Sequence, residues 1–388
     1  MITHYKPTLT RPEMTQISQI DTFGIDHIGI VGAGCAGLCL ATHLSASRQK
    51  SVTVFDDDAP RPDHVWSFWS GDETCLETAR AQSLGSWQNW GIHTHNANAF
   101  MRGEHYQYHA VSSSVYEEAL RASLERASNT AFYKARVTHL SGESQHINIH
   151  TDDQKKHPCT QVFDSATYTA PDDTMLQHFA GFYVRTSAPA FDPQTATLMD
   201  FRVSQDKGIH FMYVLPLAPD YALVESTVFS HTPCAVGWYE QQMRSYLHNV
   251  LDVEHFNIEK TEWGVIPLAF LSGPEDPKAV GIGLSGQALR ASSGYAFAQI
   301  HQQVAGISLQ EKNPKPSAGA SRFERWMDKI FLRVLARMPE KAPDMFLRLA
   351  QTLSGDEFAQ FMNGHCPWRV RLKVISAMPK APFLQALV

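Results

Sequence analysis

The chain has 388 residues, of which 43% are hydrophobic and 19% charged, a globular composition sufficient for a large domain or two to three smaller ones. A net charge of −6 and a pI near 6.3 argue against a general nucleic-acid-binding role. Residues 1–26 lack the apolar core of a signal peptide, and no run approaches the ~20 apolar residues that span a bilayer. The six cysteines are scattered without zinc-ligand spacing, so we expect no metal site and a reducing, cytoplasmic location.

The first predicted unit, residues 27–56, consists of a strand, a glycine-rich turn, a helix and a second strand. The turn reads Gly32-x-Gly34-x-x-Gly37, and the second strand ends in Asp56. This order is typical of dinucleotide binding, because glycines let the backbone approach a pyrophosphate at a helix N-terminus and the acid can bind ribose hydroxyls. The alternative is an ordinary tight turn between a strand and a helix. The motif alone does not distinguish FAD from NAD.

Residues 57–70 are predicted to form a loop that changes from polar to aromatic. Trp66, Phe68 and Trp69 occupy three of four consecutive positions, which is too apolar for a loop exposed to water. We expect these rings either to lie over a flat ligand or to pack in the core. His64, just before them, is expected either to contact the ligand or to lie at the surface.

The clearest β signal is a hairpin over residues 211–229 with a short turn at residues 218–220. Because side chains alternate between the faces of a strand, Glu225 shares a face with residues that are mostly apolar or aromatic. Burial on such a face favours the neutral carboxylic acid, which can donate a proton near pH 7. We interpret Glu225 as a catalytic acid/base. The alternative is a structural carboxylate paired with an arginine or a backbone group.

An apolar strand at residues 279–284 leads into a segment that contains Gly286 and Gly294, and then into another predicted helix. This late return would place a second set of backbone N–H groups near a flavin. A simple dehydrogenase has no need of such a return, so the pattern favours FAD over NAD.

The chain beyond residue 320 is predicted to be helical, with basic residues alternating with apolar ones from Phe323 to Leu353. A basic amphipathic surface can lie on an anionic membrane. The alternative is a solvated helix face that covers the core.

Several longer motifs extend over most of the chain, from about residue 27 to the C-terminus. They are Val31–Gly34, Asp63–Phe68, Gln177–Phe179, Phe191–Asp192, Thr197–Arg202, Tyr213–Leu217, Leu223–Glu225, Ser292–Phe297, Phe331–Leu335 and Ser376–Phe383. In these motifs the chain resembles the bacterial FAD-dependent lycopene cyclases.

The resemblance implies an α/β fold that begins with a Rossmann-like FAD-binding domain of the aromatic-hydroxylase flavoprotein type. We expect this domain to be discontinuous, with residues 27–120 and 255–320. A β-sheet substrate domain would span residues 121–254, a helical C-terminal segment residues 321–388, and an N-terminal extension residues 1–26.

The implied activity is cyclisation of the acyclic end groups of a carotene, from lycopene to beta-carotene by way of gamma-carotene. Glu225 would protonate a double bond to start carbocation chemistry with no net redox change. Reduced FAD would then act through its charge, with NAD(P)H as the external reductant. A carotene substrate in the membrane implies peripheral association with the inner face of the cytoplasmic membrane.

The motifs and the resemblance together assign two further groups of site residues. The expected cofactor-binding residues are Gly32, Gly34, Cys35, Ala36, Gly37, Asp56, Asp57, Trp66, Ser67, Gly286, Gly294 and Tyr295. The expected substrate-pocket residues are Phe68, Trp69, Tyr213 and Trp263. Asp200 and Arg202 are interpreted either as site residues or as a structural ion pair.

Three positions depart from the family pattern: Ser226 replaces a second acid, Ala166 an arginine and Ala291 a proline. These departures leave the exact substrate open. One alternative function is a flavin-dependent monooxygenase or reductase acting on another polyene or apolar substrate. Another is an inactive flavoprotein that carries a polyene.

Overall fold

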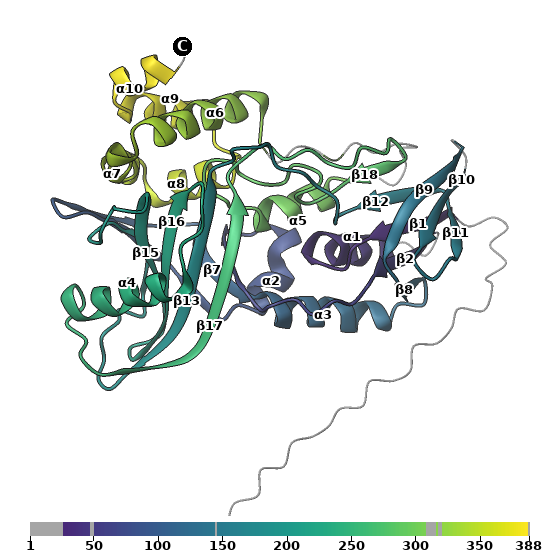
Figure 1. Ribbon diagram of the computed structural model, residues 1–388, viewed down its shortest axis with the longest axis horizontal. Helices are drawn as coiled ribbons and strands as arrows, with labels where there is room; N and C mark the ends of the chain where they lie inside the picture. The colour runs from purple at the N-terminus through teal and green to yellow at the C-terminus, as the bar shows by residue number, and fades with distance from the viewer. Residues whose placement is uncertain (1–25, 47–49, 144–145, 308–315, 317–319, 387–388) are drawn as a thin grey trace, which may run out of the picture.

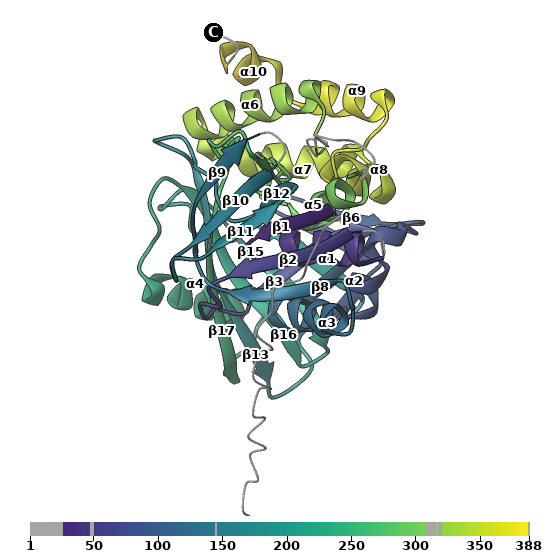
Figure 2. The ribbon, with the colours of Figure 1, turned by 90° about the vertical axis from the view of Figure 1, so that its right-hand side faces the viewer.

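The structure, a computed structural model, describes residues 26–46, 50–143, 146–307, 316 and 320–386. The predicted N-terminal extension lies outside these residues except for Asp26. Figure 1 shows a smaller sheet with its helices at one end of the molecule, a larger sheet at the other end, and the C-terminal helices above the larger sheet. Figure 2 shows the same C-terminal helices as a separate outer layer.

The smaller sheet has five strands, and every neighbouring pair in it is parallel. In spatial order the strands are β18 (Ala279–Gly281), β12 (Gln161–Asp164), β1 (Asp26–Val31), β2 (Lys50–Asp56) and β8 (Thr130–Lys134). Parallel strands are usually buried on both faces. Ile28 and Ile30 of β1 are fully buried accordingly.

Both faces of the parallel sheet are covered. One face packs on the helices α1 (Cys35–Ser45), α3 (Ser113–Glu125) and α5 (Phe297–Ala305), which share one hydrophobic cluster with β1 and β2. The other face packs on a three-stranded antiparallel sheet of β9 (Val137–Glu143), β10 (His146–Thr151) and β11 (Lys156–Cys159). This arrangement keeps the carboxyl ends of the parallel strands accessible, where open α/β sheets bind their ligands.

The larger sheet has seven strands and is antiparallel except for one pair, β14 with β5. In spatial order its strands are β17 (Phe256–Pro267), β13 (Leu176–Thr186), β16 (Tyr221–Ser230), β15 (Ile209–Ala218), β14 (Thr195–Asp200), β5 (Asn89–His93) and β6 (Asn98–Arg102). The predicted hairpin is confirmed as the pair β15–β16.

The two faces of β16 belong to different hydrophobic cores. Leu223 and Phe229 pack toward the C-terminal helices, whereas Ala222, Val224 and Val228 pack against α4 (Val236–Asn249). This alternation confirms that Glu225, which is in phase with Leu223, faces the first of these cores.

The aromatic part of the predicted loop at residues 57–70 is a strand instead. β3 (Val65–Ser70) pairs with β7 (Gln107–Ser112), which also pairs with β4 (Gly85–Trp87). Aromatic residues favour strands, and β7 offers the hydrogen-bonding edge that local sequence cannot reveal. The short helices η1 (Thr74–Leu76) and α2 (Glu77–Ala81) follow β3.

The C-terminal segment is helical as predicted. It contains α6 (Arg322–Arg337), η2 (Pro339–Lys341), α7 (Ala342–Thr352), α8 (Gly355–Met362), α9 (Trp368–Ala377) and α10 (Lys380–Ala386). α6 and α8 begin with capping boxes, Ser321 with Glu324 and Ser354 with Glu357, which satisfy the first backbone N–H groups. These helices cover the face of the larger sheet that carries Glu225.

The predicted fold class is confirmed: the chain is an α/β protein with a Rossmann-like parallel sheet, a second β-sheet region and C-terminal helices. The strands are shared between the sheets across the predicted domain ranges. β8 and β12 complete the parallel sheet, whereas β5, β6 and β17 join the larger one. Among the described residues, no helix is both long and apolar enough to cross a bilayer.

Candidate active site

A polar cavity of about 380 Å³ lies at the carboxyl ends of β1 and β2. Six of the expected cofactor-binding residues line it: Gly32, Gly34, Cys35, Ala36, Asp56 and Asp57. Gly34 is the N-cap of α1 and supplies no side-chain cap, and the first turn of α1 carries no acidic residue. The first backbone N–H groups of α1 are therefore available to an anionic group such as a pyrophosphate.

The turn into α1 depends on glycine at two positions. Gly32 has φ +93°, a conformation that side chains disfavour. A Cβ at Gly37 would lie 1.9 Å from the carbonyl oxygen of Gly32. Gly37 therefore lets α1 pack tightly on the turn and does not itself line the cavity.

Asp56 supports the turn as well as the cavity. Its carboxylate accepts hydrogen bonds from the backbone N–H of Ala33 (2.6 Å) and of Asp58 (2.9 Å), and Arg61 donates to the same group (2.5 Å). Oδ2 accepts two of these bonds and Oδ1 only one, so Oδ1 keeps a lone pair that can accept a hydrogen bond from a ribose hydroxyl.

Cys35 belongs to a small cluster at the start of α1. The sulfur atoms of Cys35 and Cys39 and a ring nitrogen of His301 provide three possible metal-ligand atoms within 4.8 Å of one another. A hydrogen bond from Cys35, and then the neighbouring His301, hold the pKa of Cys39 well below its usual range. Cys39 and His301 are buried between α1 and α5, whereas Cys35 is half-buried and lines the cavity. The expectation that the chain has no metal site stays a prediction.

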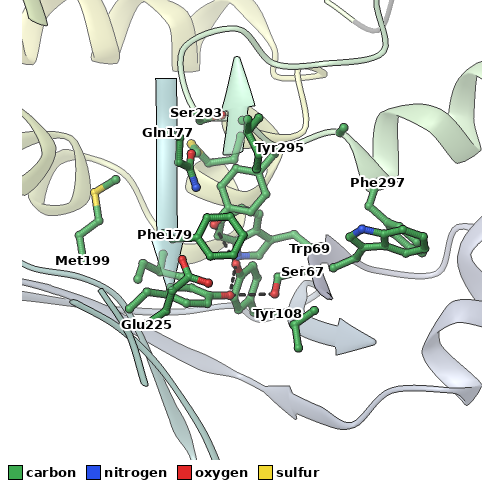
Figure 3. A pocket seen from close by; sticks show the side chains of 18 of the residues that line it. Ser67, Trp69, Tyr108, Gln177, Phe179, Met199, Glu225, Ser293, Tyr295 and Phe297 are labelled. Atoms are coloured by element: carbon green, nitrogen blue, oxygen red, sulfur yellow. Dashed lines mark hydrogen bonds between the residues drawn. The ribbon is translucent and has the colours of Figure 1, made fainter. Parts of the chain in front are cut away.

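A second, mostly apolar cavity of about 320 Å³ lies between the larger sheet, β3, α5 and the C-terminal helices. Cys35, Leu284 and Ile300 line both cavities, so the two are adjacent and share a wall. Eight predicted site residues line the second cavity: Cys35, Trp66, Ser67, Trp69, Tyr213, Glu225, Gly294 and Tyr295. Several of these side chains are shown in Figure 3.

Glu225 is the acidic residue that lines the second cavity. Thr227 donates a hydrogen bond to its Oε1, and no cation pairs with its carboxyl among the described residues. Burial, together with the neighbouring Glu262 carboxyl, raises the pKa of Glu225 to about 8. Glu225 therefore holds a proton at neutral pH and presents it to an apolar cavity.

Glu262 is a buried carboxyl that sequence reasoning missed. Glu225 on β16 and Glu262 on β17 are both paired in register with Gly181, on its two sides. A Cβ at Gly181 would lie 2.8 Å from Cγ of Glu262, so the glycine leaves room between the two strands for this side chain. Burial raises the pKa of Glu262 to about 7. Sequence alternation alone could not find the pair, because it requires the strand order β16–β13–β17.

A chain of hydroxyl groups runs along the cavity wall. Tyr213 donates to Ser67 Oγ (2.8 Å), and the Tyr108 hydroxyl lies 2.8 Å from those of both Tyr213 and Tyr295. Tyr213 is directly opposite Glu225 in the β15–β16 register. This network holds the aromatic rings in fixed orientations around the carboxyl. Tyr108 was not predicted, because its strand β7 carries no motif.

Three buried polar atoms that line the cavity lack hydrogen-bond partners among the described residues: Oε1 of Gln177, Oγ of Ser293 and Nε1 of Trp69. In Figure 3, Gln177 and Ser293 lie at one end of the cavity, and Glu225 lies beyond Phe179 toward the other. Buried polar groups are normally satisfied, so these atoms indicate where a polar ligand binds. Together with the open N-terminus of α1, they fit a cofactor that has a pyrophosphate and a polar ring system.

Four predicted site residues line neither cavity: Gly37, Phe68, Trp263 and Gly286. Phe68 packs in the core, 4.7 Å from the ring of Phe297. Trp263 is exposed, because it alternates with the buried Glu262 along β17. A Cβ at Gly286 would lie 2.5 Å from the carbonyl oxygen of Gly281, so this glycine serves backbone packing.

The structure also distinguishes between the alternatives for His64 and for the pair Asp200 and Arg202. His64 is half-buried and does not line either cavity. Asp200 is fully buried, pairs with Arg202 at 2.6 Å and accepts a hydrogen bond from Tyr246 (2.9 Å). Asp200 ends β14 and Tyr246 belongs to α4, so this arrangement is a structural ion pair between the larger sheet and that helix.

The departures from the family pattern lie in different places. Ser226 is on the opposite face of β16 from Glu225, 3.0 Å from His210 Nε2, so the missing second acid does not face the cavity. Ala166 lines the polar cavity, where its N–H donates to Asp164 (2.8 Å). Ala291 is fully buried.

The chain was compared with known proteins. It is 24% identical over 398 residues to a lycopene beta-cyclase of Pantoea ananas, and the match covers 92% of this chain and 96% of that protein. A geranylgeranyl bacteriochlorophyll reductase-like protein from Thermoplasma acidophilum has a similar structure, with a TM-score of 0.59, 11% identity, and coverage of 93% of this chain and 99% of the other. A variant of the halogenase PltM in complex with FAD gives a TM-score of 0.52 at 12% identity, covering 87% and 79%.

These structural similarities support the flavoprotein fold, because distant structures share architecture more reliably than chemistry. The family described as "Lycopene cyclase protein" matches residues 27–388, which include both cavities and the C-terminal helices. The chain therefore belongs to the lycopene cyclase family.

Proposed function

We propose that this protein is an FAD-dependent, non-redox cyclase that closes the acyclic end groups of a carotene, converting lycopene to beta-carotene by way of gamma-carotene. The observation that carries the proposal is Glu225, a protonated carboxyl in an apolar, aromatic cavity that adjoins a dinucleotide-type turn. Membership of the lycopene cyclase family supports the same substrate.

FAD is the cofactor that these residues fit best. The turn at Gly32 and the N-terminus of α1 would hold the pyrophosphate, and Asp56 would bind the ribose. The N-terminus of α5, which has no side-chain cap and no acidic residue in its first turn, lies at the second cavity and favours negative charge there. When bound and reduced, the flavin would supply an anionic ring that stabilises a carbocation, with NAD(P)H as the external reductant.

The proton chemistry belongs to Glu225. Its carboxyl donates a proton to the terminal double bond of the polyene, and the resulting cation is attacked by the next double bond to form the ring. Loss of a neighbouring proton, which the Glu225 carboxylate can accept, restores a double bond and the starting protonation state. The product is an isomer of the substrate, and no electrons are gained or lost.

The cavity wall suits a cationic intermediate. Phe179, Trp69 and Tyr213 present aromatic rings, whose faces attract cations, and the apolar lining excludes water that would otherwise trap the cation. The hydroxyl chain from Ser67 to Tyr295 holds the rings of Tyr213, Tyr108 and Tyr295 in place.

The proposal is tested by expressing the full chain in a lycopene-producing host and separating the pigments by chromatography. We expect gamma-carotene and beta-carotene to replace lycopene. Unchanged lycopene in a host that accumulates the folded, flavin-loaded protein would refute the proposed activity.

A flavin-dependent reductase or monooxygenase acting on another polyene is the second candidate, because the structure of a reductase-like protein is similar over 93% of this chain. This alternative predicts hydrogenated or oxygenated products and one NAD(P)H consumed for each product molecule. The cyclase predicts products that are isomers of lycopene and no stoichiometric consumption of NAD(P)H.

A further inference from the structure

A third cavity, of about 270 Å³, lies among the C-terminal helices and is lined almost entirely by apolar side chains. Its inner end meets the Glu225 cavity, because Ser293, Phe346, Leu349 and Met362 line both. Its walls include four methionines, whose flexible side chains adapt to ligands of different shape. They are Met327, Met345, Met362 and Met378.

The outer end of this third cavity is marked by exposed apolar side chains from three different helices. Trp326 on α6, Ile375 on α9 and Leu384 on α10 line the cavity and are 49%, 40% and 62% exposed. The cavity therefore extends from the outer face of the C-terminal helices toward Glu225. Large exposed apolar groups around such a mouth are costly in water and mark an interaction site.

The outer face continues beyond the mouth along α9. Trp368 and Leu372 are 57% and 60% exposed and form one stripe with Ile375, at positions i, i+4 and i+7. In Figure 2, α6, α9 and α10 form the outermost layer at one end of the molecule. The exposed apolar residues Trp326, Trp368, Leu372, Ile375 and Leu384 all belong to these three helices, and we call their outer surface the docking face.

The charge of this segment is opposite to that of the whole chain. Residues 320–386 contain eleven Lys and Arg against six Asp and Glu, whereas the full sequence contains 33 against 39. On α6 the exposed residues Arg322, Lys329 and Arg333 share a stripe with Trp326. Cations around aromatic and aliphatic side chains match the interface of an anionic bilayer, where rings enter the headgroup region and cations meet lipid phosphates.

We propose that the outer face of α6, α9 and α10 docks on an anionic lipid bilayer and that the third cavity admits the hydrocarbon from the bilayer to the Glu225 cavity. The docking part stands on the surface alone, whereas the passage rests on the proposed function. A hydrocarbon dissolved in lipid could then reach Glu225 without crossing water.

The test uses the full-length, flavin-loaded protein and vesicles of phosphatidylcholine with or without phosphatidylglycerol. We expect flotation with the anionic vesicles, weakened by salt because the cations are exposed. The double variant Trp368→Gln/Leu372→Gln should lose about tenfold or more in vesicle affinity, since two exposed side chains no longer enter the interface. The matched control is Val236→Gln, an exposed apolar residue at the start of α4, which should bind like the wild type.

Activity on lycopene in vesicles and in detergent micelles separates docking from catalysis. The double variant should lose activity in vesicles and retain it in micelles. Leu384→Glu, which puts a charge at the mouth, should raise KM for lycopene severalfold in both media while flavin content stays unchanged.

Three outcomes decide the proposal. Equal vesicle binding by the wild type and the double variant would overturn the proposal that this face docks on the bilayer. Unchanged KM in Leu384→Glu would overturn the passage. If the wild type floats as expected but does not act on lycopene in micelles, the proposed function fails while the docking face stands.

Discussion

The two adjoining cavities surround their carboxyl groups in opposite ways. At the glycine turn, Asp56 meets the Arg61 guanidinium and two backbone N–H groups. In the second cavity, Glu225 meets one threonine hydroxyl, apolar side chains and the carboxyl of Glu262. Donors and a cation make Asp56 a hydrogen-bond acceptor, whereas burial beside another acid raises the pKa of Glu225 and favours its neutral form. The same functional group is thus prepared for binding in one cavity and for proton transfer in the other.

Removing the acid from the second cavity should produce the largest effect. Glu225→Gln keeps the shape but loses the donated proton, so we expect cyclisation to fall by about 10³-fold, within the range for general acids. FAD content, measured from flavin absorbance, should stay at the wild-type level, because Asp56 and the turn are untouched. Glu254→Gln, at an exposed position, is the matched control. Near-normal activity of Glu225→Gln would contradict the assignment of binding to the first cavity and proton transfer to the second.

Two glycine substitutions separate packing from binding at the first cavity. Gly37→Ala places a Cβ against the Gly32 carbonyl and should lower the free energy of unfolding by ~1–3 kcal/mol. Gly34→Ala meets nothing closer than 3.8 Å, so its stability should match the wild type. It should still weaken FAD binding about tenfold or more, because the methyl group occupies space that the pyrophosphate needs. Denaturant unfolding and flavin titration measure the two effects, and normal FAD affinity in Gly34→Ala would contradict this placement.

Protonation of Glu225 should make stability depend on pH. The folded carboxyl keeps its proton up to about pH 8, whereas the unfolded one loses it near its ordinary pKa of ~4.3. Between these values the folded state binds more protons, so the free energy of unfolding falls as pH rises, on the order of a few kcal/mol in total. Glu225→Gln should show a smaller decline between pH 5 and pH 9 by urea denaturation. Identical slopes in the two proteins would show that Glu225 ionises freely when folded.

Substitution of the neighbouring acid, Glu262, should have a smaller effect, which is a shift in the pH dependence of activity. Cyclisation needs protonated Glu225, so activity should fall as pH rises through about 8. The ionised Glu262 raises the pKa of Glu225, and Glu262→Gln should therefore move this decline to lower pH. The pH profile of kcat/KM measures the shift. A profile that stays in place would show that the two carboxyls do not interact.

The smallest effect is expected at Trp263, which was predicted to line the substrate pocket. Because its side chain is exposed and points away from Glu225, Trp263→Phe should change kcat/KM by less than about twofold, as for ordinary surface substitutions. Tyr213→Phe is the informative comparison, since it removes the hydroxyl that bridges Ser67 and Tyr108 and should reduce activity more. Equal effects would mean that the hydroxyl chain does not position the site.

Predictability from sequence differed between the two cavities. The glycine turn was predictable because Gly32, Gly34 and Asp56 belong to one contiguous unit whose spacing reflects a single local geometry. The second cavity takes residues from Cys35 to Met362, and no spacing connects them. Glu225 could be predicted from the residues because the alternation of apolar side chains in its own hairpin is strong.

The incorrect predictions of substrate-pocket residues have the same cause, because no local spacing shows which residues meet the cavity. Phe68 and Trp69 are neighbours on β3, but only Trp69 lines the cavity, whereas Phe68 packs in the core against Phe297. Composition could identify the aromatic segment but not which of its sides would meet the cavity. In the same way, composition could not show that Glu262 is buried while its neighbour Trp263 is exposed.

The sequence by itself determined local geometry: a glycine-rich turn between a strand and a helix, a hairpin whose alternation places Glu225 among apolar neighbours, and basic helices near the C-terminus. These follow from backbone conformation and side-chain period, which act over a few residues. Only the tertiary structure decided that Glu262 lies across Gly181 from Glu225, that the two cavities adjoin, and that a third opens among the C-terminal helices. Strand order and helix packing bring distant segments together, and the environment that raises the pKa of Glu225 exists only after they meet.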